Sequence, residues 1–216
     1  KKPTSSNLYL VSLDPSLGTG GDYSAIEVFE LPSMIQCAEW QHNITPIQGQ
    51  IKILRDILNH IQQEIGVENS NNIYWSVENN TVGEAGLVVI KDMGEETFPG
   101  LFVSEPVRKG HVRKFRKGFN TTYGTKISAC ARLKFLIESD RIIINSRPLI
   151  SELKTFIATG TTFKAKSGQT DDLVSSLLLL IRMSVILADW DPRVTEVLSS
   201  KDFYEEDIEL PLPIFV

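Results

Sequence analysis

Short apolar runs and helical repeats alternate along this chain, and together they predict a mixed α/β fold. Residues 8–13 are an apolar run of the length expected for a buried central strand. Residues 24–31 alternate with a period of two, as a half-buried strand does, and residues 34–42 alternate less regularly. Three strands in succession favour an antiparallel meander. Further strands are predicted at residues 73–77, 141–145 and 161–165.

Apolar positions spaced by three and four predict the helices between these strands. The clearest repeat covers residues 48–65, and Gly66 is the residue at which that helix should end. Further helices are predicted at residues 81–93, 122–138, after Pro148, and 170–187. A meander followed by alternating helices and strands indicates a mixed sheet flanked by helices.

Composition excludes several other classes of protein. The 216 residues are 42% hydrophobic and 23% charged, which is ordinary for a globular protein and excludes disordered, collagen-like and coiled-coil chains. The longest apolar run, residues 177–181, is far shorter than a bilayer span, and no signal-peptide pattern opens the chain, so we expect no membrane partner and no secretion. Two cysteines, Cys37 and Cys130, do not make a disulfide framework and favour a reducing compartment.

The polarity of the two ends suggests where one domain lies. Residues 1–7 are polar and begin with Lys rather than Met, and we interpret them as a linker remnant of an excised domain. Residues 8–190 carry all the predicted elements and are expected to form one domain. Residues 191–216 form an acidic, proline-punctuated tail, and the stretch 189–209 contains eight acidic and two basic residues.

Several acidic residues stand at strand ends and at a helix start. Asp14 ends the first strand, Glu78 directly follows the strand at 73–77, and Asp171 and Asp172 open the last helix. Asp22 lies across the turn between the first two strands. In a mixed sheet such positions converge on one edge, so we expect these side chains to share a site.

A shared site of this kind favours a divalent cation. A carboxylate at the end of a buried strand is unfavourable unless it is paired, and several together repel one another unless a cation neutralises them. Carboxylate oxygens select hard ions such as Mg²⁺ or Mn²⁺. A zinc site is not indicated, because the three histidines, His42, His60 and His111, are scattered.

Each acid also has a purely structural interpretation. Asp14 precedes Pro15 and could start a turn. Glu78 could be a solvated strand end, or a charge that complements the start of the next helix. One residue of the pair Asp171–Asp172 is expected to cap the last helix, which leaves the other free. The joint arrangement is much less expected by chance than any single member.

The turn at residues 14–22 is rich in glycine, and its backbone N–H groups could cradle a phosphate. Actin-like ATPases and sugar kinases use a similar turn, but they need a second related half that this chain lacks. A dinucleotide site would need a helix after the glycines, where a strand is predicted. No GxxxxGK[ST] motif occurs, so P-loop ATP hydrolysis is not encoded.

The net charge of −5 argues against nucleic acid until its distribution is considered. Residues 108–117 contain six Lys or Arg and no acid, and the other 206 residues carry 16 basic against 27 acidic side chains. Such a run is either a solvated loop or a track for a polyanion backbone. Phe115 and Phe119 could stack on bases, but we favour a role as core anchors. The candidate DNA-binding residues are Arg108, Lys109, Arg113, Lys114, Arg116, Lys117, Lys126, Lys164 and Lys166.

Three segments carry a resemblance to a known family. Residues 10–31 (LVSLDPSLGTGGDYSAIEVFEL), 73–83 (IYWSVENNTVG) and 168–180 (GQTDDLVSSLLLL) resemble the acidic motifs in the C-terminal nuclease domain of the large terminase subunit of T4-like tailed phages. Residues 118–163, which include TTYGTK, extend the similarity over most of the chain from residue 8 to about residue 182. Thr170 stands where a His often precedes the Asp pair.

The resemblance implies an RNase H-like fold of the resolvase/integrase group. It also implies a metal-dependent endonuclease that cuts concatemeric double-stranded viral DNA around packaging, in the cytoplasm of an infected bacterium. The family's catalytic, metal-binding acids correspond to Asp14, Glu78 and Asp172, and Asp22 and Asp171 become candidate outer-shell groups.

The hypothesis that follows is two-metal phosphodiester hydrolysis with little sequence preference. Two Mg²⁺ or Mn²⁺ ions would be bridged by Asp14, with Glu78 on one and Asp172 on the other. Expected partners are double-stranded DNA and the rest of the terminase, including its N-terminal ATPase, with the portal and the small subunit as further candidates. The alternative is a non-catalytic RNase H-like module that docks DNA or the portal.

Overall fold

The central strand of the molecule is β1 (Leu8–Asp14), and the sheet grows outward from it on both sides. The computed structural model describes residues 2–109, 112–160, 162–189, 191–192 and 194. Within them, five strands form one sheet in the order β3-β2-β1-β4-β5. Its other members are β2 (Ser24–Leu31), β3 (Ile35–His42), β4 (Ile73–Val77) and β5 (Leu101–Phe102).

Strand direction follows from the connections. Short turns make β1–β2 and β2–β3 antiparallel, as the meander prediction required, whereas helical crossovers make β4 parallel to β1 and β5 parallel to β4. The strand β2 departs from its pattern, because it is buried along its whole length rather than half-buried. Helices cover both faces of the sheet, so the polar positions Glu27 and Glu30 are buried as well.

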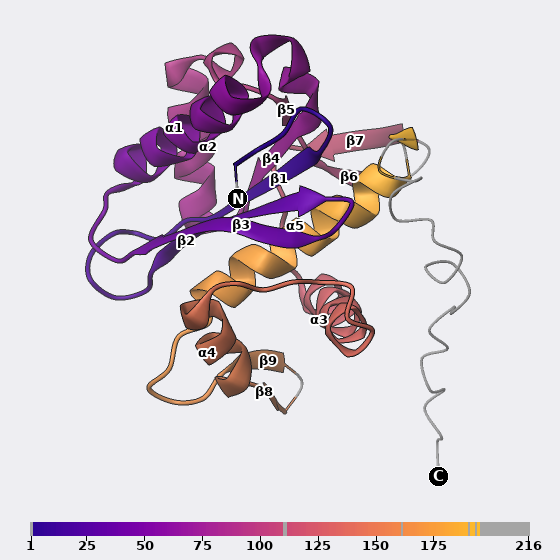
Figure 1. The fold of residues 1–216 in the computed structure, drawn as a ribbon. Coiled ribbons are helices and arrows are strands. Elements are labelled where there is room, and N and C mark those ends of the chain that lie inside the picture. The colour runs from indigo at the N-terminus through magenta and orange to yellow at the C-terminus, as the bar shows by residue number, and fades with distance from the viewer. Residues whose placement is uncertain (1, 110–111, 161, 190, 193, 195–216) are drawn as a thin grey trace.

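Figure 1 shows how the helices cover the sheet. The helices α1 (Ile47–Ile65) and α2 (Thr81–Met93) lie on one face. The most apolar helix, α5 (Asp172–Ala188), crosses the other face, and α3 (Tyr123–Glu138) and α4 (Arg147–Thr155) pack against it from outside. Two separate hydrophobic clusters result, one on each side of the sheet.

The strand predicted at residues 141–145 is wrong. This segment lies beside the start of β3 with one isolated bridge, between Ile35 and Ile143. The reason is the side chain of Gln36, whose Oε1 accepts the backbone N–H groups of Asn145 (3.0 Å) and Ser146 (2.8 Å). A side chain therefore satisfies the donors that a longer ladder would have used.

Two hairpins were missed by the sequence pattern. Much of the basic run, interpreted as a loop or a polyanion track, lies in the paired strands β6 (Glu105–Lys109) and β7 (Val112–Arg116). The strand expected at 161–165 is β9 (Thr162–Ala165), and it pairs with β8 (Phe156–Thr159), which follows α4 directly. Two short 3-10 helices, η1 (Val67–Asn72) and η2 (Glu95–Thr97), flank β4 and α2 along the chain.

The short strand β5 was not predicted, and the other elements agree with the sequence expectations to within a residue or two. In the part of the chain that the structure describes, no helix combines the length and the apolar character that a membrane crossing requires. Most of the expected acidic tail, from residue 195 onward, lies outside the described residues.

Candidate metal-dependent nuclease site

Asp14 is the last residue of β1, and the parallel pairing of β1 with β4 sets Glu78 beside it. The backbone N–H of Glu78 donates to the carbonyl of Leu13 at 2.9 Å, so the ends of β1 and β4 lie side by side where they leave the sheet. Both residues are partly buried. Asn80 donates its Nδ2 to Glu78 Oε2 at 3.0 Å, which fixes one oxygen of that carboxylate.

The helix α5 is fastened to β1 by two serines, and this fastening brings Asp172 to the same edge. Ser12 Oγ lies 2.9 Å from Ser176 Oγ and donates to the carbonyl of Ser176 at 2.8 Å, while Ser176 Oγ donates to the carbonyl of Ser12 at 3.1 Å. Asp14 lies two residues beyond Ser12, about 6.6 Å along the strand. Asp172 lies one turn before Ser176, about 6 Å along the helix. Both acids therefore extend past the serine pair toward one point.

The pKa values of Asp14 and Asp172 reflect both burial and the proximity of the other acids. Burial raises the pKa of Asp14 well above its ordinary value, and Glu78 raises it further through its charge and through a hydrogen bond that the protonated Asp14 carboxyl donates. Asp172 and Asp171 add to the same shift. Burial, followed by the charges of Glu152 and Asp171, raises the pKa of Asp172 to about 7.

This charge pattern fits a divalent cation. With no cation, burial and the mutual repulsion of the carboxylates disfavour full ionisation of the cluster. The donors are all carboxylate oxygens, the type that hard ions prefer. Among the described residues, no three His, Cys, Asp or Glu side chains are already gathered into a group that could hold an ion. The donor set fits in kind, and its side chains would have to draw together around the ion.

Asp171 and Asp22 differ in their placement. Asp171 is the N-cap residue of α5, but its side chain makes no capping bond; its Oδ2 instead accepts the backbone N–H of Ala165 at 3.2 Å and lies 3.9 Å from Lys126 Nζ. Asp22 is exposed in the glycine-rich turn and contributes slightly to the raised pKa of Asp172. The neighbouring Tyr23 donates its backbone N–H to the Asp172 carboxylate, which acts in the opposite direction.

The glycine-rich turn is held by Gln50 of α1. The side chain of Gln50 is buried, donates to the carbonyls of Ser16 (2.8 Å) and Thr45 (2.7 Å), and accepts the N–H of Ser16 at 3.3 Å. Gly18 has φ +69°, and a Cβ there would lie 2.1 Å from the Thr45 carbonyl oxygen, so only glycine fits. The turn is thereby fixed beside the sheet edge that carries Asp14, Glu78 and Asp172, called the acidic edge below.

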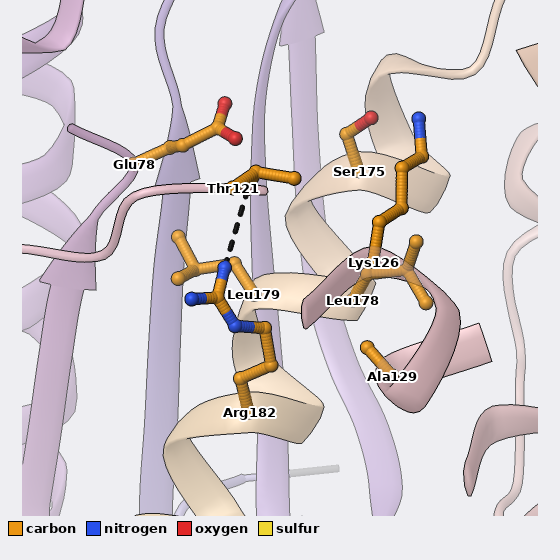
Figure 2. A pocket seen from close by; sticks show the side chains of 8 residues that line it. All are labelled: Glu78, Thr121, Lys126, Ala129, Ser175, Leu178, Leu179 and Arg182. Carbon is orange, nitrogen blue, oxygen red and sulfur yellow. Dashed lines mark hydrogen bonds between the residues drawn. The ribbon is translucent and has the colours of Figure 1, made fainter. Parts of the chain in front are cut away.

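A small cavity of about 50 Å³ lies next to Glu78, between α3 and α5. Figure 2 shows Glu78, Ser175 and Lys126 extending toward the same side of it, while Arg182 reaches from α5 toward Thr121. Lys126 also lies with its Nζ 5.5 Å from the centre of the Phe156 ring. The cavity therefore adds cationic and hydroxyl groups to the acidic edge.

The other predicted DNA-binding residues are not brought together with Lys126 at this cavity. The side chains of Arg108, Lys109, Arg113, Lys114 and Arg116 lie outside what the structure describes, although their backbone forms β6 and β7. Lys117 is exposed and forms an ion pair with Glu95, and Lys164 and Lys166 are exposed on and after β9. Phe119 is fully buried, which confirms the anchoring role favoured for it.

No family model matches this chain. Solved structures do, and three of them share the same layered architecture. The large terminase nuclease of thermophilic phage G20c with bound magnesium has a TM-score of 0.60 at 18% identity, over 84% of each chain. The Thermus phage P74-26 large terminase nuclease domain has a TM-score of 0.58 at 17% identity, over 83% of this chain and 81% of that one. The human cytomegalovirus terminase nuclease domain, Mn soaked and inhibitor bound, has a TM-score of 0.55 at 10% identity, over 84% and 82%.

This chain has the fold of the large-terminase nuclease domains. The comparison confirms the RNase H-like, mixed α/β fold class that the acidic motifs implied. The G20c terminase nuclease was also solved with bound cobalt (TM-score 0.59) and with bound zinc (TM-score 0.56).

One residue beside the acidic edge of this terminase-nuclease fold was not anticipated. Glu152 of α4 is buried, and its carboxylate accepts hydrogen bonds from Gln41 Nε2 (2.9 Å), Thr170 Oγ1 (2.9 Å) and the backbone N–H of Val174 (3.1 Å). It thus caps α5 from another helix. Its sequence signal was its place three residues after Leu149 and one before Leu153, on the apolar side of a short helix.

Proposed function

We propose that this chain is a metal-dependent endonuclease domain that cuts concatemeric double-stranded DNA during viral genome packaging, with little sequence preference. The observation that carries the proposal is the convergence of Asp14, Glu78 and Asp172 at one sheet edge, where burial and then the neighbouring carboxylates raise the pKa of Asp14. The terminase-nuclease fold supports it, because solved structures with this fold are nucleases and several contain divalent ions.

The residues that would hold the metal are Asp14, Glu78 and Asp172, with Asp22 and Asp171 as outer-shell groups. Two Mg²⁺ or Mn²⁺ ions, when bound, would supply an activated water and stabilise the leaving oxygen. Because the pKa values of Asp14 and Asp172 are raised, metal binding there would be coupled to proton release. The serine pair keeps β1 and α5 together while the acids rearrange.

DNA would be held by the hairpin β6–β7 together with Lys117, Lys126, Lys164 and Lys166. These cations would contact phosphates, which orient the duplex without reading its sequence. The variant Lys109→Ala/Lys114→Ala should weaken DNA binding in EDTA and reduce the slope of log K against log salt by about 0.9 for each phosphate that the protein no longer neutralises. Unchanged affinity and slope would mean that the hairpin is a solvated surface.

Plasmid cleavage tests the activity. We expect wild-type protein to nick and linearise plasmid with Mg²⁺ or Mn²⁺ and to be inactive in EDTA. Asp14→Asn should remove cleavage and weaken Mn²⁺ binding measured by calorimetry, while Asp92→Asn, an exposed aspartate on α2, should change neither. Full cleavage by purified Asp14→Asn would refute the assignment. The alternative docking module predicts DNA binding with no cleavage by any of these proteins.

The proposal extends to the biological context. The nuclease domain would comprise residues 8–190, following a linker at 1–7 and preceding an acidic tail at 191–216. It would act in the cytoplasm of an infected bacterium beside an ATPase part of the same terminase, with the portal and small subunit as candidate partners. Co-purification of the domain with each of these components would test the contacts one at a time.

A further inference from the structure

A buried arginine on α5 connects the hairpin β6–β7 to the acidic edge. Arg182 lies ten residues after Asp172 on the same helix, and only 9% of its side chain is exposed. Arg182 lines the cavity that Glu78 also lines (Figure 2). A buried cation at this depth needs partners, and the structure supplies them from the base of one hairpin.

The Arg182 guanidinium is held by the residues at the base of the hairpin β6–β7. Nη2 donates to Glu105 Oε1 at 2.7 Å and to the carbonyl of Asn120 at 3.1 Å, and Nη1 donates to Thr121 Oγ1 at 3.2 Å. The guanidinium carbon also lies 5.2 Å from the centre of the Phe119 ring. Glu105 begins β6 and the other three residues follow β7, so Arg182 fastens both ends of the hairpin to α5.

The same segment fixes the chain on either side of Glu78. Phe119 donates its N–H to the carbonyl of Val77 at 3.1 Å, and its own carbonyl accepts the N–H of Asn79 at 2.6 Å. Asn79 Nδ2 donates to the carbonyl of Lys117 at 2.7 Å. A Cβ on Gly118 would lie 2.5 Å from the Val77 carbonyl oxygen, so the backbone at Gly118 is in direct contact with the end of β4. The position of Glu78 therefore depends on the segment that Arg182 holds.

We propose that Arg182 is a positioning residue for DNA cleavage, a role that rests on the proposed function. It keeps the hairpin base and Glu78 in one fixed relation to Asp172, so that DNA held by the hairpin is presented to the acids. Such positioning would affect the rate of DNA cleavage, because a displacement of about 1 Å at a reacting centre can lower turnover on the order of 100-fold.

A role in positioning can be separated from a role in stability. A buried ion pair is often replaced by apolar side chains of similar volume with little loss of stability, whereas removal of one partner leaves the other charge unpaired. The test compares Arg182→Met, Arg182→Lys and the double variant Glu105→Leu/Arg182→Met. Lys134→Met serves as control, because Lys134 is an exposed cation on α3 that pairs with Glu138 on its own helix.

Three measurements are made on each protein: thermal unfolding, kcat and KM for plasmid cleavage, and hydrogen exchange of the Asn79 and Phe119 amides without metal. We expect Arg182→Met to lower Tm and to lower kcat on the order of 10- to 100-fold. The double variant should regain the wild-type Tm yet keep the low kcat and the faster exchange at both amides. Arg182→Lys should recover part of kcat, and Lys134→Met should match wild type.

Two outcomes would overturn the proposal. If the double variant regains both Tm and a kcat within about twofold of wild type, the pair only stabilises the fold. If exchange at Asn79 and Phe119 stays at wild-type rates in the double variant, Arg182 does not hold the Glu78 segment. The exchange result stands even if the wild-type protein proves not to cut DNA, so failure of this inference can be told apart from failure of the proposed function.

Discussion

The two faces of the central strand differ in what they bury. Tyr9, Val11 and Leu13 of β1 point toward α1 and α2, where the buried cluster around them is apolar. The alternate positions toward α5 begin with Leu8 and Leu10 but continue with Ser12 and Asp14.

Polar groups continue across that second face. Glu27 lies opposite Ser12 on β2, and Glu152 reaches in from α4. One face is therefore apolar throughout β1, while the other combines apolar packing with polar groups near the sheet edge.

The largest expected effect comes from a substitution in the apolar cluster on the α1 and α2 side. It is a loss of stability with no loss of activity per folded molecule. Leu54 of α1 is fully buried in that cluster, and Leu54→Ala should lower the unfolding free energy by about 2–5 kcal/mol. Urea unfolding gives this value, and cleavage per folded molecule should be unchanged. Val88→Ala, at a position of α2 that is 58% exposed, is the control expected to be near neutral. A selective loss of cleavage in Leu54→Ala would show that the faces are not independent.

A smaller effect is expected at Glu152 on the polar face. Glu152→Ala leaves the Val174 N–H, Thr170 Oγ1 and Gln41 amide without their acceptor, which costs about 1–3 kcal/mol, partly offset by weaker repulsion of Asp172. Glu152→Gln keeps one acceptor oxygen and should be intermediate in urea unfolding. Equal stability of the Ala and Gln variants would contradict a capping role for this carboxylate.

The smallest effect concerns Glu27 and depends on pH. Burial raises the pKa of Glu27 well above 4.5; the Gln36 bond at 2.8 Å opposes this, and the charges of Glu39 and Glu152 add to it. The native state then retains a proton that the unfolded chain releases, so unfolding free energy falls as pH rises from about 4.5 toward the folded pKa.

Glu27→Gln removes that loss, since a neutral amide takes the place of the protonated acid. We expect the stability of Glu27→Gln relative to that of wild type to increase as pH rises above about 4.5, because only the wild type loses stability there. Urea unfolding at several pH values measures this, with the exposed Glu138→Gln as control. Parallel pH curves for wild type and Glu27→Gln would mean that Glu27 is ionised in the native state.

Much of the fold could be predicted from local pattern. The helix at residues 48–65 and the strand at 73–77 were placed to within a residue, because burial of one helix face leaves a period in the sequence and burial of both faces of a strand leaves a short apolar run. The segment 141–145 and the hairpin β6–β7 could not, since one depends on the distant side chain of Gln36 and the other consists largely of charged residues.

By itself, the sequence determined which side chains are the candidates for the proposed chemistry: acids at two strand ends and a helix start, and a basic run separate from them. The tertiary structure decided what holds those groups in relation to one another. The Ser12–Ser176 pair, the buried carboxylate of Glu152 and the hydrogen bonds of Arg182 all join residues far apart along the chain. Hydrogen bonds of this kind leave no period in a sequence, because each partner is a single polar residue whose mate is chosen only when the sheet and helices have packed.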